Sequence, residues 1–250
     1  MADLHWTMPI ARWTSISTAG VPGVEFIDPM VRRRLSRLSR LALQSAHDCT
    51  GEHRALRVVF ASRHGELART TGILESIQAA DPVSPTAFSL SVLNAVTGVF
   101  GIARGDRSAA SAIAAGPETL GYALLEAFAQ YESDASSPVL LVYAHEPADP
   151  VYGDVDDDRE SEALAILLDR RSALGHLTCA VTARADSAGG EGTDATQSAA
   201  VRRCLSGQSG QSGQSGQSGQ SGQSGQAGHA DATWQHGDSV WRWSWHAHAA

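Results

Sequence analysis

The segment Ser62-Arg63-His64-Gly65-Glu66 is the one place where a hydroxyl, an imidazole and a carboxylate lie close together in the sequence. These are the groups of a nucleophile, a base and an orienting acid. Catalytic triads usually converge from distant segments, however, and the chain contains no G-x-S-x-G nucleophile elbow. A hydrolase site therefore stays an alternative, and the simpler interpretation is a strand-to-helix turn in which Glu66 caps the positive end of the helix.

Two other groups carry the residue types of metal ligands. His246 and His248 alternate and would place two imidazoles on one face of a strand, but no third ligand is in reach by sequence, so a terminal tail is favoured. The acidic residues from Asp154 to Asp158 lack the loop spacing of a calcium site. A dinucleotide site requires a glycine-rich loop that follows a strand and opens a helix, and the glycine-bearing segments of this chain are not placed in that way. We expect neither a metal nor a cofactor.

The basic and sulfur-bearing residues exclude further chemistries. All 19 basic residues are arginine, so a lysine Schiff base and a lysine-dependent phosphate-binding loop are both impossible. Cys49, Cys179 and Cys204 are widely spaced and form no CxxC pair, which predicts neither a disulfide framework nor a zinc site. Each is interpreted as a small buried or surface thiol, with Cys204 open to exposure because it precedes a low-complexity tract.

The elements that must position these groups alternate along the chain. Apolar periodicity and capping residues predict helices over Asp28–Asp48, Glu66–Ala79, Ser84–Gly105 and from Gly116 onward, and strands over Arg57–Ser62, Ser108–Ala114, Pro138–Ala144, Glu162–Asp169 and His176–Ala183. The last two strands are expected to form a hairpin around Ser172–Gly175. Such alternation indicates a layered α/β fold.

A low-complexity tract interrupts this pattern near the C-terminus. Consecutive Ser-Gly-Gln triplets run from Ser206 to Gln226, and the flanks are rich in small residues. Such a stretch buries too little apolar surface to offset its ordering entropy, so residues 186–232 are expected to form a flexible insert within a single domain of residues 1–250. The alternation of Trp241, Trp243 and Trp245 with polar residues then predicts a half-buried final strand.

Charge and hydropathy limit the partners and the compartment. The net charge is −8, and the basic residues gather only at Arg32-Arg33-Arg34, Arg37 and Arg40, so nucleic acid is not expected. The arginines fit either a solvated helix face or a docking surface for an acidic partner such as an acyl carrier protein, bound through Arg32, Arg33 and Arg37. No apolar stretch approaches the roughly 20 residues of a membrane span, and the N-terminus lacks a signal pattern, so we expect a cytoplasmic protein.

The segment Val83–Ile102 resembles a stretch of the β-ketoacyl synthases, in which a proline precedes a helix that carries an asparagine, a small residue and a glycine. Here these are Pro85, Asn94, Ala95 and Gly98. An alanine-rich strand, an elbow and a long buried helix follow in the family's order. The resemblance covers roughly Asp28 to Pro147 and rests on several elements in sequence rather than on any single motif.

The resemblance breaks at the residue that performs the family's chemistry. Placing Leu120-Gly121-Tyr122-Ala123 on the corresponding helix segment puts Ile113 at the nucleophilic cysteine, or Ala112 or Ala114 if the placement shifts by one residue. The family needs a thiolate there to accept an acyl group as a thioester. It also needs two histidines from a C-terminal half that this chain is too short to contain. No catalytic residue is therefore assigned.

The chain is most similar to the short chain-length-factor-like proteins that accompany an active ketosynthase in aryl polyene biosynthesis. This resemblance implies a thiolase-like half-fold with layered α-β-α architecture and a heterodimer with the active subunit. The strand carrying Ser108, Ser111 and Ile113 would pair across the dimer, and Phe88, Leu90, Leu93 and Asn94 would lie near the acyl tunnel. The alternative is a small acyl-processing enzyme, an acyltransferase or hydrolase, that uses His64 or a cysteine.

Overall fold

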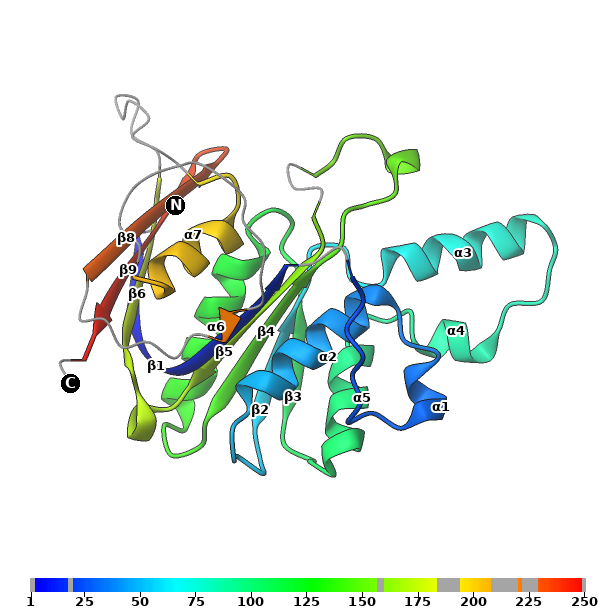
Figure 1. The fold of residues 1–250 in the computed structure, drawn as a ribbon. Coiled ribbons are helices and arrows are strands. Elements are labelled where there is room, and N and C mark those ends of the chain that lie inside the picture. The colour runs from blue at the N-terminus through cyan, green and yellow to red at the C-terminus, as the bar shows by residue number, and fades with distance from the viewer. Residues whose placement is uncertain are drawn as a thin grey trace.

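The computed structural model describes residues 3–17, 20–156, 160–183, 194–207, 220–221 and 229–248 (Figure 1). Its strands are β1 (Leu4–Ser17), β2 (Arg57–Ala61), β3 (Ala110–Ile113), β4 (Val139–His145), β5 (Glu162–Leu168), β6 (Gly175–Ala183), β7 (Gln220–Ser221), β8 (His229–His236) and β9 (Ser239–Ala247). Its α-helices are α1 (Pro29–Arg32), α2 (Arg37–Cys49), α3 (Leu67–Gln78), α4 (Pro85–Ser89), α5 (Ala95–Arg104), α6 (Thr119–Ser133) and α7 (Gln197–Leu205). The predicted α/β alternation is confirmed.

The described strands form one sheet in the order β3-β2-β4-β5-β1-β6-β9-β8, with β7 beside β1. Helices α2 and α5 cover one face, and α6 and α7 cover the other (Figure 1). Every residue of β5 is buried, as its uninterrupted apolar run requires of a strand covered on both faces. The layers therefore follow the order helix, sheet, helix.

The N-terminal strand β1 was not predicted, and it overturns the expected hairpin. One half of β1 pairs with β5 and the other half with β6, so β5 and β6 are separated by β1 and do not pair with each other. The apolar residues Trp6, Met8 and Ile10 alternate along β1 and are all buried, which is the pattern of a strand with one face in the core. The hairpin was inferred from closeness in sequence alone.

Two predicted helices are each divided in the structure. The helix expected over Asp28–Asp48 is split into α1 and α2, because the hydroxyl of Ser36 accepts the backbone amide of Ser39 at 3.0 Å and starts a new helix. The helix expected over Ser84–Gly105 is split into α4 and α5. Gly105 ends α5 in the left-handed conformation, with a φ of 64°.

Helices α3 and α4 project from the body as an arm with almost no contact to the sheet (Figure 1). Neither helix contains a buried residue. Apolar side chains nonetheless lie exposed on this arm and just after it, among them Leu74, Ile77, Phe88 and Val92. Exposed apolar side chains gathered on one projection are typical of a surface that contacts another molecule.

The expected flexible insert over residues 186–232 is wrong in part. Helix α7 lies within it and buries Ala200, Val201, Cys204 and Leu205 against the core, so this flank has enough apolar surface to be ordered. Most of the Ser-Gly-Gln tract lies outside the described residues. After it, β8 and β9 form a hairpin in which Trp241 and Trp243 are fully buried, which confirms the predicted tryptophan face.

In the part of the chain that the structure describes, no helix is long and apolar enough to cross a membrane.

Candidate functional site

The carboxyl ends of three parallel strands meet at one edge of the sheet. Strands β3 and β4 both run parallel to β2, in the order β3-β2-β4. The turn after β2 carries Arg63 and His64, the turn after β3 carries Gly116 and Pro117, and His145 ends β4. In open α/β sheets this edge is where ligands bind, so it is the candidate site.

Ile113 is the last residue of β3 and lies beside Ala61 in the parallel register. The turn that follows is tight: Gly116 has a φ of 59°, and the hydroxyl of Thr119 both accepts the amide of Ala115 at 2.9 Å and donates to the carbonyl of Gly116 at 2.6 Å. Helix α6 starts at Thr119. The strand-turn-helix architecture is present, and the side chain at its head is a hydrocarbon that cannot act as a nucleophile.

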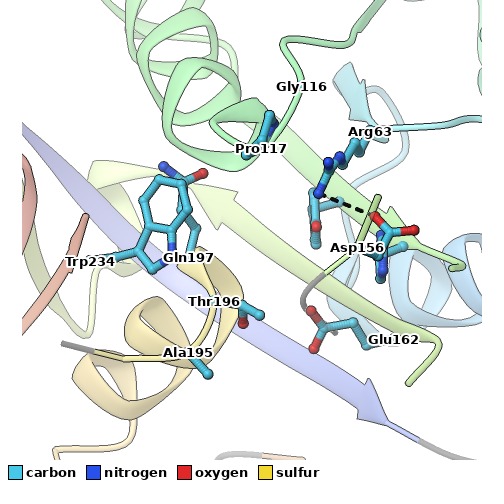
Figure 2. Close-up of a pocket in the computed structure, with 11 residues that line it drawn as sticks. Arg63, Gly116, Pro117, Asp156, Glu162, Ala195, Thr196, Gln197 and Trp234 are labelled. Carbon is cyan, nitrogen blue, oxygen red and sulfur yellow. Dashed lines mark ion pairs between the residues drawn. The ribbon is translucent and has the colours of Figure 1, made fainter. Parts of the chain in front are cut away.

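A small pocket of about 40 Å³ opens beside this turn (Figure 2). Its lining comes from the ends of β2, β4 and β5, the turn before α6, and the start of α7, and includes Arg63, Pro117, His145, Glu162, Thr196, Gln197 and Trp234. A pocket of this size holds only a few water molecules, since one water needs about 10–15 Å³ on this measure. It is too small for an acyl chain.

The charges in the pocket neutralise one another. Asp156 lies 3.1 Å from Arg63 and 2.8 Å from the Nε2 of His64, and its other oxygen accepts the backbone amide of Ala148 at 2.7 Å. Burial by itself would raise the pKa of Asp156, but these hydrogen bonds and the neighbouring histidines outweigh it and lower that pKa. Figure 2 shows the Arg63–Asp156 ion pair among the residues that line the pocket.

A second charged group among the residues that line the pocket is also paired within the protein. Arg202 of α7 forms an ion pair with Glu162 at 3.1 Å, and the hydroxyl of Ser198 donates to the same carboxylate. His145 is buried next to Glu162 in the β4–β5 register, and its ring centroid lies 6.1 Å from that of His64. These contacts tie α7 to the sheet rather than leaving a charge for a ligand.

Ser62, His64 and Glu66 do not form a triad, because their side chains contact three different partners. The Ser62 hydroxyl accepts the amide of Gly65 at 3.0 Å, and His64 pairs with Asp156. Glu66 stands at the N-cap position of α3, as predicted, but its side chain makes no capping hydrogen bond to the helix. Its buried carboxylate instead accepts the hydroxyls of Ser36 and Ser39, at 2.7 Å and 2.5 Å, and pairs with Arg69.

Sequence reasoning missed the central role of Asp156. In the sequence Asp156 is only one of a run of acidic residues without the loop spacing of a calcium site, whereas in the structure its side chain is only 7% exposed and joins Arg63 to His64. The position of Asp156, 92 residues after His64, carries no local signal of this pairing. Asp157 and Asp158 lie outside the described residues.

None of the three cysteines is a candidate nucleophile. Cys49, Cys179 and Cys204 lie on α2, β6 and α7, and all are buried, so the suggested exposure of Cys204 is wrong. Burial raises the pKa of Cys49 and of Cys204 to about 12 and raises that of Cys179 well above its ordinary value. A reactive thiol requires the opposite shift.

The residues expected near an acyl tunnel lie on and after the projecting arm. Phe88 of α4 is 64% exposed, and Leu90, Leu93 and Asn94 fall between α4 and α5. Leu93 packs against the core beneath α2 and α5, and its Cδ1 would lie 3.0 Å from a Cβ placed on Gly65. Leu93 thus contacts the turn after β2, while Phe88 is exposed on the arm.

The residues expected on a dimer strand lie at the edge of the sheet. Among the described residues β3 pairs only with β2, so its other edge is unpaired. Ser111 and Ile113 belong to β3, with the Ser111 hydroxyl accepting the amide of Gln130 at 3.0 Å. Ser108 precedes β3 and lines a larger cavity of about 280 Å³ between β3 and α5.

The arginines expected to dock an acyl carrier protein do not share one helix. Arg32 ends α1 and is paired with Glu25, Arg33 follows it, and Arg37 starts α2. A guanidinium nitrogen of Arg40 also lies 2.7 Å from the carbonyl of Arg32. The contact between Arg40 and the carbonyl of Arg32 shows that α1 and α2 fold back on each other, so these arginines are not spaced along the face of one helix.

A family model described as beta-ketoacyl synthase, N-terminal domain, matches residues 6–244. No curated protein matches the chain. The fold is similar to that in the structure of a ketosynthase (ApeO) in complex with its chain length factor (ApeC) from Xenorhabdus doucetiae. That likeness has a TM-score of 0.71 at 24% identity and covers 96% of this chain and 99% of that chain.

Two further solved structures share the fold at lower similarity. The ishigamide ketosynthase/chain length factor gives a TM-score of 0.56 at 16% identity, over 80% of this chain and 73% of that chain. A beta-ketoacyl synthase from Burkholderia phymatum STM815 gives 0.54 at 11% identity, over 81% and 69%. The mixed sheet between helical layers is therefore the thiolase-like fold of the ketosynthases.

Proposed function

Because the chain belongs to the family described by the β-ketoacyl synthase N-terminal domain, we propose that it is a non-catalytic chain length factor that pairs with an active β-ketoacyl synthase. The observation that carries the proposal is that Ile113 ends β3 at the head of an intact strand-turn-helix, at the position where the resemblance to the β-ketoacyl synthases implies a thiolate. A scaffold kept in good geometry without its nucleophile is suited to binding rather than to reaction.

The proposed partner contacts this chain along the unpaired edge of β3 and the arm formed by α3 and α4. An unpaired strand edge offers backbone donors and acceptors to a second chain. Ile102 is 83% exposed and lines the cavity beside β3, and Phe88 is exposed on the arm. A partner strand against β3 would cover both the edge and this apolar surface, and Ser108, Ser111 and Ile113 would lie in the interface.

The likeness of the fold to structures of a ketosynthase with a chain length factor supports the proposal that this chain is a ketosynthase-like subunit. By extension, the product belongs to a polyene or fatty-acid-type series, aryl polyenes included. The length of the acyl chain would then be limited by residues on and after the arm, namely Phe88, Leu90, Leu93 and Asn94. An acyl carrier protein would dock at Arg32, Arg33 and Arg37. The single domain would span residues 1–250 and act in the cytoplasm.

Co-expression with the ketosynthase encoded nearby, followed by size-exclusion chromatography, tests the pairing. The expected result is one complex containing both chains, with poor recovery of this chain expressed alone because the arm and the β3 edge stay exposed. A folded monomer in both the presence and the absence of the ketosynthase would overturn the proposal.

Intact-mass measurement distinguishes the alternative of a small acyl-processing enzyme. The purified chain is incubated with malonyl and acyl carrier protein, with the co-expressed ketosynthase as the positive control. We expect the ketosynthase to gain an acyl group and this chain to gain none, because its three thiols are buried. Persistent acylation of this chain, lost in His64→Gln, would favour the enzyme.

A further inference from the structure

The hairpin of β8 and β9 brings together histidines that are far apart in the sequence. His246 of β9 lies opposite His229 of β8 on one side and opposite His176 of β6 on the other. These side chains share the sheet face opposite to the buried tryptophans, and His229 is 55% exposed. The tail interpretation of His246 and His248 is therefore wrong, since both histidines have imidazole neighbours on adjacent strands.

One pair, His229 and His246, has its ring nitrogens directed at each other. The two Nδ1 atoms are 3.3 Å apart, and the ring centroids are 4.5 Å apart. On the far side of the first ring, the Nε2 of His229 lies 2.8 Å from a carboxylate oxygen of Asp231. The other oxygen of Asp231 accepts the hydroxyl of Ser244 at 2.5 Å, which holds the carboxylate in place.

This network sets the tautomer of His229. A carboxylate only accepts, so Nε2 of His229 carries the proton that it donates to Asp231. In the neutral ring Nδ1 then presents a lone pair toward His246. A histidine that donates one ring nitrogen to a carboxylate and directs the other at a second imidazole has the arrangement that orients ligands in metal sites.

The spacing of the two nitrogens decides between metal geometries. Two nitrogens at about 2.0–2.1 Å from a tetrahedral ion are about 3.3–3.4 Å apart. Adjacent donors in a square plane with bonds of similar length would be only about 2.9 Å apart. Without a metal, the contact between the two Nδ1 atoms is a hydrogen bond, so a bound ion would displace the proton that lies between them. The observed 3.3 Å fits the tetrahedral case.

We propose that His229 and His246 bind a Zn²⁺ ion through their Nδ1 atoms, with Asp231 orienting His229 and water completing the tetrahedron. Within the described residues no three His, Cys, Asp or Glu side chains are grouped to hold a metal ion, so the protein supplies two ligands only. Such a site is accessible from solvent. It does not depend on the proposed ketosynthase partnership.

The bound ion would cross-link β8, the strand at the edge of the sheet, to β9. His229 is the first residue of β8 and His246 is the penultimate residue of β9. Among the strands that the structure describes, β8 pairs only with β9, and it follows the low-complexity tract. A metal bond between these residues joins the open end of the hairpin and stabilises the folded state by mass action, since the unfolded chain does not hold the two imidazoles together.

The chain contains its own matched control pair. His176 and His248 lie on the same surface with ring centroids 4.9 Å apart, but their planes cross at 73° in an edge-to-face contact. If exposed imidazoles bound Zn²⁺ non-specifically, both pairs of histidines would contribute equally to Zn²⁺ binding. A built site uses only His229 and His246.

Isothermal titration of the tag-free full chain with ZnCl₂, together with thermal unfolding, tests the inference. We expect one Zn²⁺ per chain and a rise in Tm on addition of Zn²⁺. His229→Gln and His246→Gln should weaken binding at least about tenfold and abolish the Tm rise, and Asp231→Asn should weaken binding by about tenfold through the lost orientation of His229. His176→Gln and His248→Gln should change affinity by less than about twofold.

Co²⁺ gives a second readout, since a tetrahedral Co²⁺ complex absorbs visible light far more strongly than hydrated Co²⁺. The band should appear with the native chain and with His248→Gln, and not with His246→Gln. The inference is overturned if the native chain binds no Zn²⁺, if the His229 and His246 variants bind as the native chain does, or if the His176 and His248 variants lose binding to the same extent.

Discussion

The backbone amide of Ser62 donates a 3.2 Å hydrogen bond to the carbonyl oxygen of Ile113. This bond joins the end of β2 to the end of β3, so Ile113 is held in the sheet by its backbone whatever its side chain. The turn after it is closed independently by Thr119. The geometry of this strand-turn-helix therefore does not depend on the side chain at position 113.

Ile113→Cys is expected to create the only rapidly alkylated thiol of the folded chain. A pKa of about 12 for Cys49 and Cys204, against an ordinary value of 9.0, lowers their thiolate fraction about 1000-fold at neutral pH. Intact mass after brief iodoacetamide treatment should show one adduct on the variant and none on the native chain. Ile113→Ser is the control, and rapid labelling of the native cysteines would contradict the interpretation.

Gly121→Ala should destabilise the fold. A Cβ at Gly121 would lie 2.5–2.7 Å from ring atoms of Trp241, which is itself fully buried, so helix or strand must move. We expect a loss of about 1–3 kcal/mol in the free energy of unfolding, measured by urea denaturation. Gly72→Ala on the exposed helix α3 meets nothing within 4 Å and should instead stabilise by up to about 1 kcal/mol. Equal effects of the two substitutions would refute the packing argument.

Asp156→Asn should lower stability near neutral pH and have a smaller effect in acid. The pKa of Asp156 is lowered in the folded state, so its ionised form contributes stability above the ordinary value of 3.8, and that contribution is lost as the pH falls through the lower folded value. We expect a deficit of about 1–3 kcal/mol at pH 7 that shrinks below about pH 4. A deficit that stays constant down to pH 2.5 would show that the charge of Asp156 is not responsible.

Ala112→Pro should prevent pairing with the ketosynthase and leave the fold intact. The carbonyls of Ala109 and Ile113 accept the amides of Val58 and Ser62, so by strand alternation the amide of Ala112 faces the unpaired edge. Proline there removes an outward donor that β2 does not use. Co-purification should be lost while circular dichroism stays unchanged, and retention of the complex would exclude a pairing through β3.

Ser111→Pro is the matched variant for that experiment. Its amide faces β2 by the same alternation, so proline at this position should lower the Tm of the isolated chain as well as abolish pairing. If Ala112→Pro lowered the Tm as much as Ser111→Pro, its effect on pairing would reflect unfolding rather than a lost edge contact.

Several elements could be predicted because their signals are local. The apolar residues Leu38, Leu41 and Ala42 recur at helical spacing and are buried in α2, and the run Pro138–Ala144 predicts β4 to within one residue at each end. Strand β1 was missed although it alternates, because Pro9 and Arg12 interrupt the pattern at its centre. Helix α7 was missed because composition was averaged over a range that is ordered only in part.

The chemistry of the candidate site divides in the same way. Sequence alone determined that lysine chemistry is absent and that a hydrocarbon stands at position 113, because both follow from residue identity. Only the tertiary structure decided that His64 pairs with Asp156 rather than with Glu66, and that His246 faces His229. These partners are 92 and 17 residues apart, and their contact depends on strand order and register, which arise from the packing of the whole sheet.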